Sequence, residues 1–215
     1  KRFSLPGLSA PAPRLALPAP PAPLPTAVRA EQFLDIPIPD HSADDNACQA
    51  AQSRGQFLAR QDRWDELAAE IRAADDARLS TPGGMPIAEL LAYGARADVI
   101  HAVEHGLQDD LPGTHSTFVD GISGLEEVRQ EYPDDPYIAL IVAHSHIDIA
   151  WAWRGTSWDP VVPKLNRNRF AAHFDRAAEI MAPYCFLELG SPSMAATCCS
   201  LMAGKQASGR RIADI

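Results

Sequence analysis

Apolar residues recur at helical spacing through most of the chain beyond residue 41. In the segment WDELAAEIRAADDARL, the positions Trp64, Leu67, Ala68, Ile71 and Ala74 follow the i, i+3, i+4, i+7 spacing of an amphipathic helix. Similar patterns, with cap residues and glycine or proline breaks between them, predict an all-α fold without a strand. Six to seven helices are expected, over residues 42–59, 64–79, 86–106, 124–129, 134–154, 169–183 and 191–204, with loops at 111–124 and 155–165.

The longest apolar run extends from Asp134 to Arg154 and reads DDPYIALIVAHSHIDIAWAWR. Its start combines an aspartate cap with Pro136 at an early helical position, and its end places the cationic Arg154 before Gly155. A run of about twenty residues is too long for a typical strand. Although IALIVA alone would suit a buried strand, the length favours a helix, and the rest of the chain is expected to pack around it.

This run also carries the densest group of metal-ligand residue types, His144, His146 and Asp148. In a strand, alternate side chains share a face, so the three would form a plausible zinc site. In a helix, His144 and Asp148 pair across one turn while His146 points elsewhere. The secondary structure of residues 138–150 therefore decides between metal chemistry and a structural role.

The words HSHIDIAWAW closely resemble the metal-binding signature of the large retaining α-mannosidases. The resemblance implies that His144, His146 and Asp148 bind zinc and that Asp148 also orients a sugar. It covers about ten residues, whereas those enzymes continue with a catalytic barrel of several hundred residues. Only 61 residues follow Arg154 here, and His173 is their one histidine. A zinc-dependent glycoside hydrolase is thus the alternative function, and not the leading one.

Residues 1–40 contain 10 of the 19 prolines. Proline fixes φ and removes a hydrogen-bond donor, so this arm is expected to be extended rather than helical. We predict two parts, the proline-rich arm at 1–40 and a helical domain at 41–215. The arm is a candidate for self-association between copies or for docking on a partner.

Residues 124–204 resemble a tetratricopeptide-like helical repeat, and residues 42–80 do so loosely. The resemblance rests on EYPDDPYIALIVA, on the Phe174-x-x-Ala177 spacing, and on Pro183 at the close of the second helix. It implies antiparallel helix pairs in a right-handed array whose concave surface binds another protein or peptide. The chain departs from the family in lacking a strict 34-residue period and in its loop of about eleven residues.

Charge and cysteine content narrow the function classes. The net charge of −9, from 28 acidic and 19 basic residues, argues against nucleic acid and against an anionic membrane as partners. Four cysteines without a C-x-x-C pair predict neither a disulfide framework nor a cysteine zinc site, and the cytoplasm is the expected compartment.

The remaining candidate motifs favour structural roles. HAVEH, from His101 to His105, matches an inverted zinc-peptidase pattern, but two histidines in the last turn of a helix also suit the helix dipole. Trp151, Trp153 and Trp158 are expected to pack rather than to form a sugar-binding platform. We therefore expect a non-enzymatic protein-binding scaffold without catalytic residues or a cofactor.

Overall fold

The computed structural model describes residues 42–156 and 161–204, and within these ranges the fold is all-helical, as the sequence predicts. The predicted arm at 1–40 lies outside the described residues. The helices are α1 (Ala43–Arg60), α2 (Trp64–Asp76), α3 (Ile87–Gln108), η2 (Ser116–Phe118), α4 (Asp120–Glu131), α5 (Pro136–Arg154), α6 (Lys164–Met181), η4 (Ala182–Leu189) and α7 (Pro192–Gly204).

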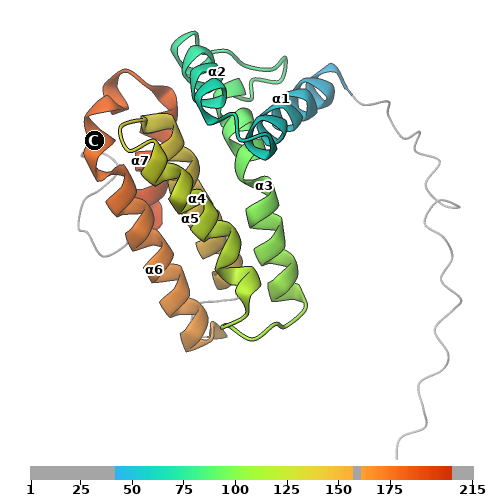
Figure 1. Ribbon diagram of the computed structural model, residues 1–215, viewed down its shortest axis with the longest axis vertical. Helices are drawn as coiled ribbons and strands as arrows, with labels where there is room; N and C mark the ends of the chain where they lie inside the picture. The colour runs from blue at the N-terminus through green and yellow to red at the C-terminus, as the bar shows by residue number, and fades with distance from the viewer. Residues whose placement is uncertain (1–41, 157–160, 205–215) are drawn as a thin grey trace, which may run out of the picture. The chain divides into compact units, whose positions relative to one another are not determined.

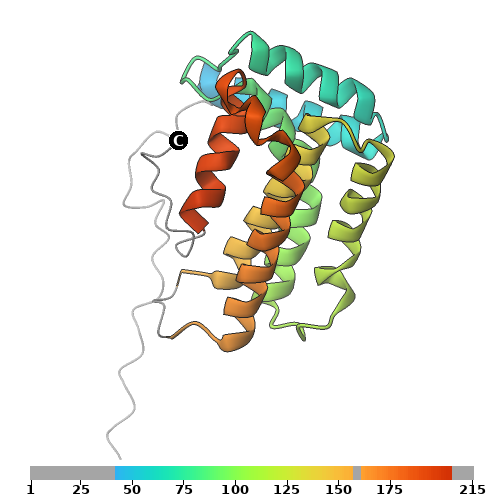
Figure 2. The same ribbon diagram turned by 90° about the vertical axis from the view of Figure 1, so that its left-hand side faces the viewer.

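Helix α5 lies at the centre of the fold, in contact with α2, α3, α4, α6 and α7 (Figures 1 and 2). Every residue from Tyr137 to Ala150 is buried except Asp148. A helix that is apolar on all sides is stable only when neighbours cover each side, and each buried Ile or Leu stabilises the fold by roughly 1.5–3 kcal/mol. The prediction that the chain packs around this segment is confirmed.

Local sequence signals account for the helix starts. Ser42 and Asp45 form a capping box at α1, with the Asp45 amide donating to Ser42 Oγ at 3.1 Å. At α5, the Asp135 carboxylate accepts from the amides of Tyr137 and Ile138 at 2.8 and 3.1 Å. The loop predicted at 111–124 is wrong in its second half, because η2 and the first turn of α4 occupy it. No side chain caps the start of α4, where Val119 occupies the N-cap position, so no local signal predicts this helix start.

Two glycines bring α1 and α3 into direct backbone contact. A Cβ added to Gly94 would lie 1.9 Å from the carbonyl oxygen of Gln52, and one added to Gly55 would lie 2.0 Å from that of Leu91. Both obstacles are helix backbone, which cannot move aside as a flexible side chain can. The crossing of α1 and α3 therefore requires glycine at both positions.

A buried carboxylate, Asp75 at the end of α2, joins three helices. It accepts hydrogen bonds from Tyr137 Oη at 3.1 Å, from the Ser193 amide at 3.0 Å, from Ser193 Oγ at 2.6 Å, and from Ser191 Oγ. Burial, and then the charge of Asp75, raise the pKa of Tyr137 to about 12. Ser191 also accepts from the Met194 amide at 3.1 Å, so its side chain caps the start of α7.

The described cysteines differ in exposure. Among the described residues, Cys48, Cys198 and Cys199 form no disulfide. Cys198 is buried and Cys199 is exposed, because α7 buries one face only. No helix in the described ranges is both long enough and apolar enough to span a membrane.

Replacing Gly94 with alanine should destabilise the domain by about 3 kcal/mol, because the new methyl group overlaps the backbone of α1. The free energy of unfolding in urea, monitored by circular dichroism, measures this change. Gly124→Ala is the matched control, since Gly124 lies in α4 with no atom near its added Cβ. That control should be neutral or stabilise the fold by up to about 1 kcal/mol. Equal urea midpoints for Gly94→Ala and the unmodified chain would contradict the close crossing.

Candidate functional site

The three predicted metal-ligand residues lie on one helix but point to three different neighbours. His144 Nε2 bonds with Thr197 Oγ1 of α7 at 2.8 Å. His146 bonds with residues of α4 and α6, and Asp148 Oδ2 accepts from Arg96 Nε of α3 at 2.8 Å. The helical reading of residues 138–150 is confirmed, and the structure does not bring the triad together. The expected His144–Asp148 pair is wrong, because each side chain bonds to a neighbouring helix instead.

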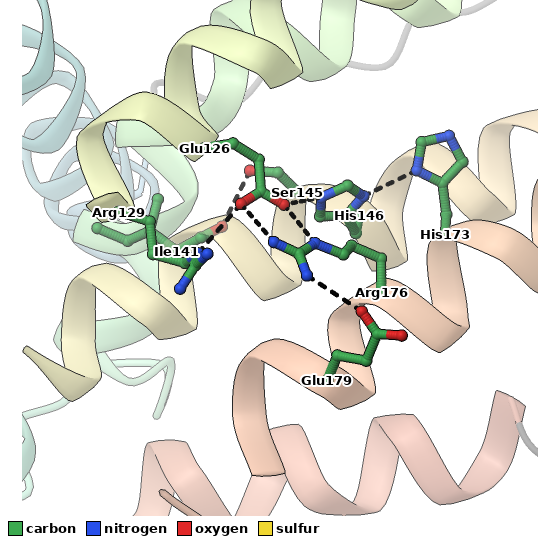
Figure 3. Close-up of polar contacts among 8 residues, drawn as sticks. All are labelled: Glu126, Arg129, Ile141, Ser145, His146, His173, Arg176 and Glu179. Carbon is green, nitrogen blue, oxygen red and sulfur yellow. Dashed lines mark hydrogen bonds and ion pairs between the residues drawn. The ribbon is translucent and has the colours of Figure 1, made fainter. Parts of the chain in front are cut away.

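Glu126 of α4 is the centre of a polar cluster between α4, α5 and α6 (Figure 3). Its carboxylate accepts two hydrogen bonds from Arg176, at 2.7 and 2.9 Å, and one from Arg129 at 3.0 Å. His146 Nε2 lies 3.1 Å from the Glu126 carboxylate. Arg176 in turn donates to Glu179 at 3.0 Å. One carboxylate thus joins three cationic or imidazole groups from three helices.

The contact of His146 with Glu126 fixes which ring nitrogen carries a proton. A carboxylate only accepts, so His146 Nε2 must be protonated. Its other nitrogen, Nδ1, lies 2.8 Å from His173 Nδ1 of α6. Two nitrogens at this distance share one proton, because two N–H groups would repel each other. His173 Nε2 points away from the cluster (Figure 3).

The surroundings shift the pKa values of this cluster in opposite directions. Burial alone would raise the pKa of Glu126, but the hydrogen bonds from His146, Arg176 and Arg129 outweigh it and lower that pKa well below the usual range. For His173, burial, followed by the charges of His146 and Arg169, lowers the pKa to about 4. At neutral pH the cluster therefore holds an ionised Glu126 and a neutral His173.

A second polar cluster lies on the α3 side of α5. Arg96 is only 3% exposed and bonds to Asp148 at 2.8 Å and to Glu89 at 2.9 Å. The two carboxylates outweigh burial and raise the pKa of Arg96, which stays charged. Its Nη1 is the one buried side-chain nitrogen or oxygen without a partner among the described residues. Burial, and then the charge of Arg96, lower the pKa of the nearby His144.

A cleft of about 470 Å³ adjoins this second cluster. We call it the α3–α5 cleft. Trp151 is 47% exposed there, although its ring also packs against Phe170 with a centroid distance of 5.1 Å. The lining residues are Tyr93, Ile100 and Glu104 of α3, Asp148, Trp151 and Ala152 of α5, and Gly155 and Thr156 beyond its end.

The other predicted candidates divide between core and surface. Trp153 is 4% exposed and packs on Phe118, as expected. Trp151 is half exposed, and its ring also packs against Phe170 and Phe174. Trp158 lies outside the described residues. His101 and His105 are exposed on α3, and His101 bonds with Tyr93 Oη at 3.3 Å. Among the described residues, no group of three or more His, Cys, Asp or Glu side chains is arranged to hold a metal ion.

The sequence reasoning missed both Glu126 and Arg96. Each lies on a different helix from its partners, 20 residues from His146 and 52 residues from Asp148. The one available signal is the presence of His and Asp on an apolar helix, because such residues require polar partners elsewhere in the chain when they are buried. The sequence alone does not identify those partners.

Comparison of the chain with known proteins returns no match to a protein-family model, a curated protein or a solved structure.

The histidine pair should make the stability of the domain sensitive to acid. The pKa of His173 is about 4 in the folded chain and about 6.5 when unfolded, so the unfolded chain binds the extra proton first as pH falls. The contribution of the neutral ring is complete above pH 6.5 and is lost as pH falls towards 4. We expect a loss of about 2 kcal/mol over this interval, measured by urea unfolding at a series of pH values.

His173→Gln should flatten this pH dependence, because an amide can bond to His146 without titrating. His101→Gln, at an exposed histidine on α3, is the control and should leave the slope unchanged. Identical slopes for His173→Gln and the unmodified chain between pH 6.5 and 4 would contradict the shared-proton arrangement.

Proposed function

We propose that this chain is a non-enzymatic protein-binding module and that the α3–α5 cleft receives a peptide segment of its partner. The observation that carries the proposal is the half-exposed Trp151 at a cleft of about 470 Å³. Tryptophan is enriched among residues that dominate binding energy, because it buries a large rigid surface at small entropic cost. A volume of this size suits a side chain and its flanking backbone.

The interior polar side chains are used in hydrogen bonds between helices, which supports a binding role over catalysis. His144 bonds to α7, His146 to both α4 and α6, and Asp148 to α3. These bonds hold the four neighbouring helices against α5. Histidine and carboxylate groups used in this way stabilise the packing. A zinc hydrolase would need the same three groups to converge on one point.

We also propose that the fold is built from antiparallel helix pairs of the tetratricopeptide-like kind. Helices α5 and α6 support this, since they run side by side along their length (Figures 1 and 2). The pair is joined at one level by His146 with His173 and at another by Trp151 with Phe170. In such arrays the partner lies on a surface formed by successive helices, and the α3–α5 cleft is of this type.

The proposal is tested by selecting binders from a displayed library of random dodecapeptides on the full chain. Peptides that bind the unmodified chain should bind Trp151→Ala about tenfold more weakly, because truncation removes the largest exposed ring of the cleft. Tyr93→Ala, on the α3 side of the cleft, should weaken binding less, because Tyr93 is only partly exposed. Fluorescence anisotropy of labelled peptides measures each affinity.

Phe57→Ala is the matched control. Phe57 is an aromatic residue of α1 with 48% exposure and an arginine over its ring, but it does not line the cleft. Binding should be unchanged by this substitution. If Phe57→Ala and Trp151→Ala weaken binding equally, or if no selected peptide depends on Trp151, the cleft is not the binding site.

A further inference from the structure

We infer that the α3–α5 cleft recognises a basic side chain of the partner, an arginine or a lysine. This inference rests on the proposed function and adds the chemistry of the occupant. The lining carries two carboxylates, Glu104 and Asp148, and two aromatic rings, Tyr93 and Trp151. Among the described residues no lysine or arginine lines the cleft, and Arg96 lies behind the lining with its guanidinium carbon 5.3 Å from the Tyr93 ring centroid. Carboxylates combined with aromatic faces are the arrangement that binds guanidinium and ammonium groups.

The charges behind the lining leave the cleft negative. Asp148 is paired with Arg96, but Arg96 also binds Glu89, so this group of three carries one net negative charge. Glu104 is exposed on the same side and adds a second. Arg154 contributes one positive charge near Trp151, and the neighbouring His101 is exposed on α3. The sum is negative, as is the chain as a whole at −9.

The end of α5 adds a directional contribution. Trp151, Ala152 and Gly155 belong to its last turn and its C-cap, the end at which the helix dipole carries a partial negative charge. Part of this charge is met within the chain, since the Trp151 carbonyl accepts from the Gly155 amide at 2.9 Å and the Trp153 carbonyl accepts from Asn166 at 2.7 Å. Gly155 closes the helix with φ of 64°. A cation in the cleft would therefore meet the favourable end of the helix dipole, and an anion would be repelled.

Trp151 already attracts a cation of its own chain. The guanidinium carbon of Arg154 lies 5.9 Å from the Trp151 ring centroid, within the usual range of a cation–π contact. Arg154 also donates to the carbonyl of Gly155 at 3.1 Å, which holds it at the end of the helix. Arg154 competes with an incoming basic side chain for the ring, so its removal should favour binding.

A titration that does not depend on the peptide library tests the charge requirement. The probe is acetyl-arginine amide, and its uncharged isostere, acetyl-citrulline amide, is the control. The reporter is the indole N–H of Trp151 in a ¹H–¹⁵N spectrum of the full chain, assigned by its loss in Trp151→Phe. We expect the arginine probe to shift this signal in a saturable way and the citrulline probe to leave it in place. Equal shifts from both probes, or none from either, would overturn the inference.

Two substitutions at the cleft separate charge from shape. Glu104→Gln should weaken binding of the arginine probe about threefold, the usual effect of one exposed ion pair, while Glu127→Gln on α4 should have no effect. Arg154→Ala should strengthen binding by about twofold to threefold. Neither position has an observed role in holding the helices together through Asp75 or Glu126, so both variants are expected to fold. If Glu104→Gln leaves the affinity for the arginine probe unchanged, the inference that the cleft binds a basic side chain is contradicted.

The proposed function and the inference fail in different ways. If library peptides depend on Trp151 but carry no essential arginine or lysine, the cleft is a binding site for an apolar segment and only the inference is wrong. If no peptide depends on Trp151 while the arginine probe shifts its indole signal, the cleft binds a small cation and the peptide-binding function is wrong.

Discussion

The burial of α5 on all sides is the constraint on which the rest of the structure depends. A buried polar group without a partner costs about 1–3 kcal/mol, so the polar side chains of this helix need hydrogen-bond partners. Ser145 donates to the Ile141 carbonyl of α5 itself at 2.9 Å, whereas three others bond to the helices that cover α5. His144 meets Thr197 of α7, His146 meets Glu126 of α4 and His173 of α6, and Asp148 meets Arg96 of α3. These contacts specify which neighbour packs on which face, whereas apolar contacts alone would permit several arrangements.

Sequence reasoning predicted the helices because their signals are local. The cap at Asp135, the proline after it and the glycine at 155 all act within a few residues of the helix ends. The start of α4 was missed for the same reason, since Val119 provides no side-chain cap. The glycine crossing of α1 and α3 could not be predicted, because Gly55 and Gly94 take their meaning from a helix about 40 residues away.

Local sequence patterns cannot predict the hydrogen-bond partners of His144 and Asp148, because these partners lie far away in the sequence. The i, i+4 rule pairs His144 with Asp148, but that rule describes an isolated helix in water. Once both side chains face other helices, a buried hydroxyl and a buried arginine offer better geometry, and the tertiary contacts replace the local one. The three residues of the H-x-H-x-D pattern therefore make separate hydrogen bonds to different neighbouring helices. In a strand the same three residues would share one face and could converge on one site, so the secondary structure determines their role.

The α3–α5 cleft lies at the end of α5 where the helix is no longer buried on all sides. Burial extends to Ala150, interrupted only at Asp148, and Trp151 is the first residue beyond it with a large exposed surface. Asp148 belongs to both regions, since it neutralises the buried Arg96 and also lines the cleft. Its orientation is therefore fixed by the core, and a ligand would meet a carboxylate already held in place. Preorganisation of this kind lowers the entropic cost of binding, so a cleft of modest size can still be selective.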